Sequence, residues 1–230
     1  MRFNPTRILL ILFIAMIAMI VCQGCALFAV KEEKYAQELA DDGMEAYQEG
    51  DYKEAIESFE KIKDWYPFSK FAMLAELKIA DSHYKLKEYD DAVTAYEEFE
   101  NLHPLNEAIP YVIFQTGLCY FEQVDTPDRD QTRTRKALDA FNRQIKRFPK
   151  DIYALKAGEY TNVCYKSLAE SELGIGIYYY KSKHYMAALK RFKAVLTNYP
   201  DVGVHHQAIQ YIAMCEILLS KQDNRIPLRN

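Results

Sequence analysis

The sequence lacks the features that mark most enzymes and most nucleic-acid binders. It contains no H-E-x-x-H, no G-x-S-x-G and no Walker loop, and its five histidines are scattered along the chain. Its formal net charge is −4, whereas a protein that contacts phosphates needs a basic face. We therefore expect a chain that is not an enzyme and that binds no nucleic acid, no metal and no dissociable cofactor.

Cysteine and strand signals are equally sparse. Cys119, Cys164 and Cys215 show no C-x-x-C spacing, so neither a metal cage nor a disulfide framework is indicated. Each of the three lies among apolar residues in a stretch with helical spacing, which predicts a buried structural thiol. No segment alternates apolar and polar residues as a half-buried strand does, so we expect an all-α fold.

The first residues have the order of a secretory signal, in which a basic start precedes an apolar core and a small residue. Arg2 and Arg7 supply the positive charge, and residues 8–21 are fourteen uninterrupted apolar residues. As a helix that run would span about 21 Å, which is short of the roughly 30 Å hydrocarbon layer of a membrane. We expect residues 1–24 to be a signal peptide; an anchor helix that stays uncleaved is the alternative.

Gly24-Cys25 resembles the bacterial lipobox, in which the cysteine thiol is acylated and becomes the first residue of the mature protein. Cys22-Gln23 departs from the residues that the lipobox prefers before its small residue. The resemblance implies that Cys25 carries a covalent diacylglycerol and an N-acyl chain, with residues 25–33 as a tether. Ala26 follows in place of the inner-membrane retention signal Asp, so sorting to the outer membrane is allowed.

The remaining sequence is organised by a repeat with an aromatic residue at its first position, Ala at its fourth, an aromatic residue at its eighth, and then Pro. Its copies are Tyr52-Ala55-Phe59-Pro67, Tyr89-Ala92-Tyr96-Pro104, Ala137-Phe141-Pro149 and Tyr185-Ala188-Phe192-Pro200. The first two copies are 37 residues apart, which is the length of a helix-turn-helix unit that buries its face by stacking on its neighbours. The pattern resembles the tetratricopeptide repeat and favours a binding protein over a catalyst.

Helical spacing of apolar residues between the prolines predicts ten helices, or about five antiparallel pairs in a solenoid over residues 34–220. The predicted ranges are 34–49, 52–66, 70–87, 89–102, 108–124, 133–148, 151–169, 171–183, 185–198 and 203–220. Residues 221–230 are predicted to form a flexible tail. Gly43, Ala80, Gly117 and Gly176 keep a regular distance from the prolines, except that the interval after Gly117 is eight residues longer. We expect these small residues to allow close helix packing, and the extra residues to form a protruding loop at 123–134.

Three stretches look like the BamD family of the machinery that inserts β-barrels into the outer membrane. They are residues 64–69 (DWYPFS), 106–118 and the loop Asp128-Arg129-Asp130. The resemblance implies an outer-membrane lipoprotein on the periplasmic face, a scaffold that binds BamA, other lipoproteins of the machinery and unfolded β-barrel proteins. Another envelope lipoprotein with this repeat, a secretin pilotin or a cell-division coordinator, is the alternative.

Aromatic residues recur four positions after the small residues of the first helices: Tyr47, Tyr84, Phe121 and Tyr180. In the repeat fold this offset lines the concave surface, so the row predicts a substrate groove for an apolar peptide; packing between adjacent repeats is the alternative. Tyr66 and Phe68 are further candidates, either as substrate contacts or as wedges between repeats.

Charge is unevenly distributed along the chain. Residues 41–107 carry 18 acids and 7 bases, whereas residues 129–230 carry 18 bases and 9 acids. This asymmetry predicts different partners for the two ends, or two solvated faces. The resemblance places contact with the periplasmic POTRA domain of BamA at the last helix pairs, where the family carries an arginine at the position of Arg191. Lys190, Lys183 and Arg129 are the other partner-binding candidates, with local pairing to Asp128 and Asp130 as the alternative for Arg129.

Overall fold

The computed structural model describes residues 33–223, and every regular element in that range is a helix. The predictions for the signal peptide, for Cys25 and for most of the tail lie outside these residues. The chain divides into two compact units, unit 1 at residues 1–88 and unit 2 at residues 89–230. In the described part, no helix combines the length and the apolar content that crossing a membrane requires.

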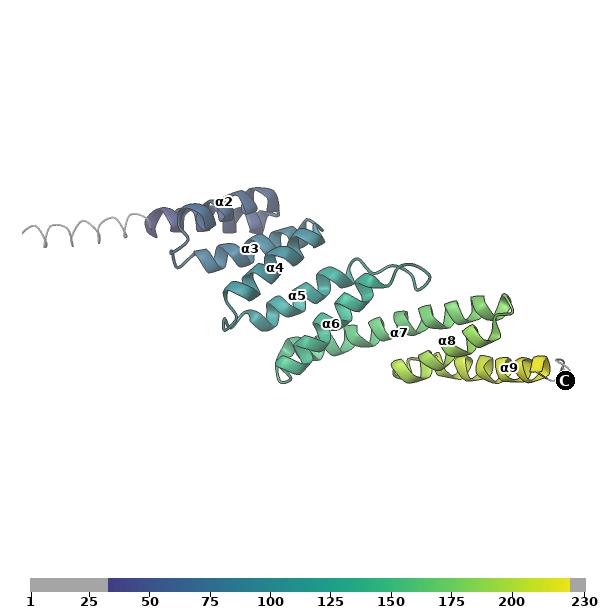
Figure 1. Cartoon of the computed structure of the whole chain (residues 1–230). Helices are drawn as coiled ribbons and strands as arrows, with labels where there is room; N and C mark the ends of the chain where they lie inside the picture. Colours follow the sequence, from purple (N-terminus) through teal and green to yellow (C-terminus); the bar gives the residue numbers. More distant parts are fainter. Residues whose placement is uncertain (1–32, 224–230) are drawn as a thin grey trace, which may run out of the picture. The chain divides into compact units, whose positions relative to one another are not determined.

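Unit 1 consists of a helix over residues 33–49, α2 (Tyr52–Trp65) and α3 (Ala72–Lys85) (Figure 1). The first two helices are joined by a tight turn in which Gly50 has φ +87°, and Asp51 starts α2 by accepting a hydrogen bond from the Glu54 N–H at 3.3 Å. The core is formed by one face of each helix and contains Ala40, Ala46, Ala55, Phe59, Ile62, Ala75 and Ile79.

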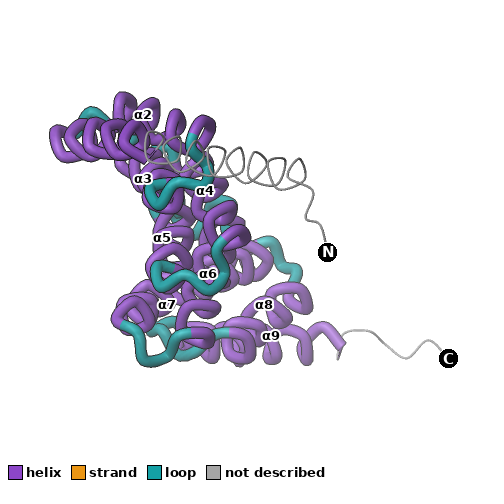
Figure 2. Tube along the Cα trace, turned by 90° about the vertical axis from the view of Figure 1, so that its left-hand side faces the viewer, coloured by secondary structure: helices purple, strands orange, loops and turns teal. Residues whose placement is uncertain are grey.

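Unit 2 contains six helices in the described range, and each packs on the next along the chain. They are α4 (Tyr89–Leu102), α5 (Ile109–Phe121), α6 (Thr132–Arg147), α7 (Ile152–Lys181), α8 (Tyr185–Asn198) and α9 (His205–Asp223). Figure 2 shows the same helices as a tube joined by short loops. The antiparallel helix pairs predicted from the repeat are therefore confirmed.

One element differs from the prediction. The sequence predicts two helices, at 151–169 and 171–183, but α7 is a single helix of 30 residues, about 45 Å long (Figure 1). The division near residue 170 was wrong because nothing there stops a helix: no proline follows, and Gly174 and Gly176 both lie within helical backbone. The first half of α7 packs against α5 and α6 and its second half against α8.

A phenylalanine ring on a glycine is the recurring contact within the helix pairs. A Cβ added to Gly43, Gly117 or Gly176 would lie 2.8, 2.6 or 2.5 Å from a ring carbon of Phe59, Phe141 or Phe192, respectively. All three rings are completely buried. The prediction that small residues permit close packing is confirmed for these glycines, and the group that approaches is the aromatic ring of the second helix.

In unit 2 the next helix covers the other face of the same rings. Tyr160 stacks on Phe141 with 5.2 Å between centroids, and Tyr211 stacks on Phe192 with 4.9 Å. Each tyrosine lies nineteen residues after its phenylalanine. The rings are thus fixed on both faces and cannot move away from an added methyl group.

Within residues 33–223, Cys119, Cys164 and Cys215 are buried, as predicted. Burial raises the pKa of the Cys164 thiol to about 12 and also raises the pKa of Cys215. Because the thiolate is the reactive form, these groups behave as small apolar side chains at neutral pH.

Gly174 and Gly176 give a matched stability test within one helix. We expect Gly176→Ala to lower the free energy of unfolding by about 1–3 kcal/mol, because the new methyl group overlaps the fixed Phe192 ring. Gly174→Ala meets no atom within 4 Å and should raise it by about 0.5–1 kcal/mol through higher helix propensity. Urea denaturation monitored by circular dichroism measures both changes; equal effects of the two substitutions would contradict the role of the ring contact.

Candidate binding surfaces

Tyr47 is half-buried at the end of the first helix of unit 1. Its ring lies edge-on to Tyr52 at 5.3 Å, and the Lys78 ammonium lies 4.6 Å from its centroid. Lys78 in turn forms an ion pair of 2.7 Å with the buried Asp81. Burial, followed by the charge of Asp81, raises the pKa of the Tyr47 phenol to about 12. The ring therefore has a neutral hydroxyl and an exposed part, which suits contact with a polypeptide.

Tyr66 and Phe68 lie in the turn between α2 and α3, which is at the other end of unit 1 from Tyr47. Tyr66 is half-buried, whereas Phe68 is 100% exposed and Trp65 beside it is 62% exposed. Tyr84, in the last turn of α3, lies at the Tyr47 end because α2 and α3 are antiparallel. The structure therefore brings Tyr47 and Tyr84 to one end of unit 1 and does not bring Tyr66 and Phe68 to them.

Phe121 is used for packing between neighbouring helices of unit 2. Its ring lies 4.8 Å from that of Tyr160 and 6.3 Å from that of Phe141, in both cases edge-on. Tyr180, in the same row of the sequence, likewise contacts Tyr185 and Tyr211. The rings of Phe121 and Tyr180 are therefore used for packing between repeats, which is the alternative to the groove, because they contact other aromatic rings of unit 2.

The loop between α5 and α6 is held in place by one buried side chain. Gln131 is 4% exposed, and its amide nitrogen donates to the Thr126 and Arg129 carbonyls at 3.0 and 3.2 Å. Its amide oxygen accepts from the hydroxyls of Thr134 at 2.9 Å and Ser167 at 3.0 Å. All four hydrogen-bonding positions of the amide are used, so the loop predicted from the longer repeat is fixed against α7.

A pocket of about 580 Å³ lies between this loop and the second half of α7. We name it the loop pocket; it is lined by Pro127, Asp128, Arg129, Glu170, Ser171, Gly174, Ile175, Tyr178 and Tyr179. Its wall on α7 is mainly apolar, and charged groups lie at the loop and at Glu170. Gly174 adds to the space because it has no side chain. Of the two neighbouring glycines, only Gly176 permits close helix packing, since Gly174 faces no atom within 4 Å.

Arg129 is exposed at this pocket, and the two aspartates beside it bond locally. Asp130 accepts from the Thr132 N–H and hydroxyl at 3.3 and 3.0 Å, at the start of α6. The pKa of the Asp128 carboxyl is lowered, first by its hydrogen bond to Thr126 and last by the charge of Arg129. Local bonding thus accounts for the aspartates and leaves the Arg129 guanidinium at the mouth of the loop pocket.

Arg191 has a carboxylate partner within unit 2. One guanidinium nitrogen donates to both oxygens of Glu172 at 3.2 and 3.0 Å, so that α8 is tied to α7. This pairing raises the pKa of Arg191. The arginine side chain is still 41% exposed, whereas the glutamate is 15% exposed. Lys190, the residue before Arg191, and Lys183, two residues before α8, are both exposed.

Some of the acidic and basic residues that make the charge distribution uneven form ion pairs with one another within unit 2. Arg133 pairs with both oxygens of Asp90 at 2.8 and 3.1 Å. Arg143 and Arg147 both contact the carboxylate of Glu100, at 3.0 and 2.7 Å. These pairs join the acidic α4 to the basic α6, so the opposite charges of the two sequence regions partly stabilise the fold.

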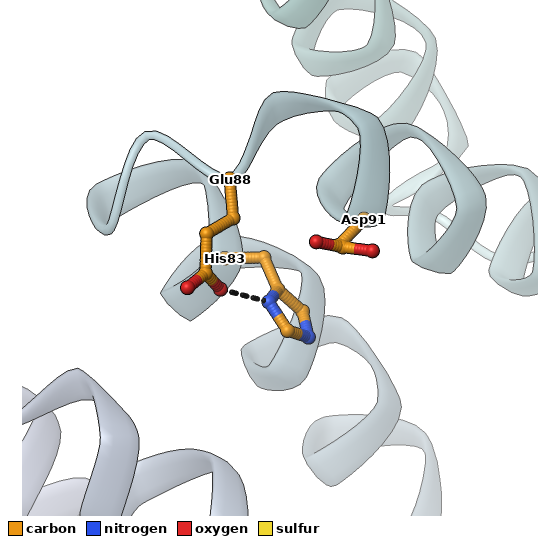
Figure 3. Close-up of side chains that lie close together, drawn as sticks. All are labelled: His83, Glu88 and Asp91. Carbon is orange, nitrogen blue, oxygen red and sulfur yellow. Dashed lines mark hydrogen bonds and ion pairs between the residues drawn. The ribbon is translucent and has the colours of Figure 1, made fainter.

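His83 and Glu88 form a hydrogen bond at the end of unit 1. His83 Nδ1, in the last turn of α3, lies 2.7 Å from Glu88 Oε2 (Figure 3). The preceding residue, Lys87, has φ +62°, a left-handed conformation that glycine occupies at the corresponding Gly50 turn. The pair therefore accompanies a helix-ending turn.

The loop pocket is not predicted from the sequence because its two sides are about 45 residues apart in the chain. The unusually long third repeat was a usable signal for one side. For the other side the signal was Gly174-Ile175, a small residue on a helix with no facing aromatic ring at the repeat spacing.

The described architecture is that of a tetratricopeptide-repeat protein, a class that presents surfaces for other polypeptides. The tetratricopeptide-repeat domain of P58(IPK) has the same fold, with a TM-score of 0.50 and 14% identity over 79% of this chain and 46% of that one. A family model described as "YfiO: Outer membrane lipoprotein" matches residues 32–224. This chain belongs to that family of outer membrane lipoproteins.

Curated relatives of the chain share one name, outer membrane protein assembly factor BamD. The relative from Caulobacter vibrioides is 30% identical over 81% of this chain, and that from Rickettsia prowazekii is 30% identical over 87%. The relative from Neisseria gonorrhoeae is 26% identical over 84%. The chain spans 63% of the Caulobacter protein and 82% of the Rickettsia protein.

Proposed function

We propose that this chain is an assembly factor for outer-membrane proteins, a non-catalytic scaffold that binds other polypeptides. The observation that carries the proposal is the family match over residues 32–224, which includes all of the described helices. Relatives from three genera bear the name of such a factor. A pilotin or a cell-division coordinator would share the repeat architecture but is not favoured by these relatives.

The anchoring of the chain follows from the same proposal. Cys25 carries the lipid, and residues 25–33 lead from the membrane to the first helix, so that both units lie on the periplasmic side of the outer membrane. The partners are BamA, through its periplasmic POTRA domain, other lipoproteins of the machinery, and unfolded β-barrel proteins. The lipobox-like Gly24-Cys25 and the lipoprotein family support this placement.

Depletion separates the proposed function from the alternative. If the chain serves the general assembly machinery, its depletion lowers the amounts of many outer-membrane β-barrels together, because they share one insertion route. Quantitative mass spectrometry of isolated outer membranes measures this. Selective loss of one secretin, with the other barrels unchanged, would instead indicate a pilotin.

The substrate surface is assigned to the Tyr47 end of unit 1, since Phe121 and Tyr180 are used in core packing. We expect Tyr47→Ala/Tyr84→Ala to weaken binding of a peptide from the final strand of a barrel by roughly tenfold or more, as loss of aromatic anchors does. Fluorescence anisotropy with the labelled peptide measures it. Tyr47→Phe/Tyr84→Phe keeps the rings and should bind normally; unchanged affinity in a folded alanine variant would refute this surface.

The partner contact with BamA is assigned to Arg191, with Lys190 and Lys183 beside it. Arginine suits carboxylates because its planar group donates in parallel. Glu172 uses one of its nitrogens, and the exposed part of the side chain remains for an acidic group of the POTRA domain. Arg129, at the loop pocket, is a second basic contact in this proposal.

A charge swap distinguishes the internal role of Arg191 from its partner role. Arg191→Glu should weaken co-purification with BamA at least tenfold, since both the internal pair and the partner pair become repulsive. The double variant Arg191→Glu/Glu172→Arg restores the internal pair and its thermal stability, but it leaves a carboxylate at position 191. Continued loss of BamA in the double variant indicates direct contact, and full recovery would show that position 191 acts only within the fold.

A further inference from the structure

The turn between α2 and α3 displays two aromatic rings that the fold does not use. Phe68 is 100% exposed at its tip, and Trp65 is 62% exposed at the end of α2. The turn is ordered by its own bonds: the Ser69 N–H donates to the Tyr66 carbonyl at 3.0 Å, and the Phe71 N–H donates to the Ser69 hydroxyl at 3.1 Å. These bonds order the backbone on both sides of Phe68.

This turn lies at the end of unit 1 where the polypeptide enters from the amino terminus (Figure 1). Glu33, the first described residue, lines a pocket of about 530 Å³ together with residues 64–69. Its carboxylate also pairs with Lys70, just after the turn, at 3.5 Å. Cys25 is eight residues before Glu33 and, even in a fully extended chain, is at most about 29 Å from it.

We infer that Trp65 and Phe68 insert into the interfacial region of the phospholipid leaflet that holds the lipid on Cys25. The inference rests on the proposed lipid anchor, because the short tether keeps this turn near the bilayer surface. Tryptophan favours the membrane interface, where its ring is apolar and its N–H can bond to water or headgroups. Lys34 and Lys70 are 76% and 68% exposed and can approach lipid phosphates.

Insertion of the aromatic turn would add a second membrane contact to the lipid anchor and so restrain unit 1 further. A lipid on a tether restrains only distance, whereas a lipid and an inserted aromatic turn restrain orientation as well. Glu33 and Asp64 flank the rings and favour shallow insertion, since a carboxylate is costly to bury in the bilayer. The Tyr47 end of the first helix, fourteen residues or about 21 Å further along, then faces away from the leaflet.

Trp65 is the only tryptophan of the chain, so its fluorescence reports this turn alone. The experiment uses full-length lipidated protein in phosphatidylethanolamine–phosphatidylglycerol vesicles, with acylation of Cys25 verified separately by mass spectrometry. We expect Trp65 to be quenched by bromine on the lipid acyl chains and protected from iodide in the water. Phe68→Ser should lose most of the bromine quenching, because the neighbouring ring no longer holds the turn in the interface.

The control moves the reporter to the other end of the same helix pair. In Trp65→Phe/Gln48→Trp, the tryptophan occupies an exposed position on the first helix and should be quenched by iodide but not by brominated lipid. Iodide quenching of Trp65 in acylated protein would overturn the insertion, and equal bromine quenching at both positions would show general adsorption instead. Quenching of Trp65 only by an added bromine-labelled barrel peptide would assign the turn to substrate. Absence of acylation would contradict the anchor itself, a result that mass spectrometry shows independently.

Discussion

The contact of a buried phenylalanine ring with a helical glycine is the constraint on which both units depend. It brings the two helices of a pair closer than a side chain would allow, and it fixes which residue of one faces which residue of the other. Where a tyrosine of the next helix stacks on the opposite ring face, as Tyr160 and Tyr211 do, the same ring also sets the position of the following pair. A dense interior of this kind accommodates added volume poorly.

This constraint also decides which aromatic side chains are available for binding. Phe121 and Tyr180 occupy the positions predicted for a groove, but their rings contact Phe141, Tyr160 and Tyr211. Trp65 and Phe68, in contrast, follow the last buried residue of α2, Ile62, and lie beyond the region that the ring contacts organise. Trp65 and Phe68 are therefore better candidates for external contacts than Phe121 and Tyr180.

The repeat was visible in the sequence because the ring contact has a fixed spacing: Phe59 follows Gly43 by sixteen residues, as Phe192 follows Gly176. Helix pairs and the extra loop could be predicted from the spacing of the repeat, and the buried cysteines from the apolar residues around them. The continuity of α7 could not, because the two halves resemble separate helices of a repeat, and their fusion depends on which neighbours each half packs against. Nor could the loop pocket be predicted, since it requires Gln131 to reach Ser167, 36 residues later.

The charge that unit 2 offers to a partner is what remains once the ion pairs within the unit are taken into account. Asp90 and Glu100 pair with Arg133, Arg143 and Arg147 within unit 2. These five residues together therefore carry a net charge of only +1. Lys183 and Lys190 remain exposed near Arg191, whose own pair with Glu172 is only partly shielded from solvent. Exposed basic side chains thus persist on α8 after pairing, and an acidic partner surface would complement them there.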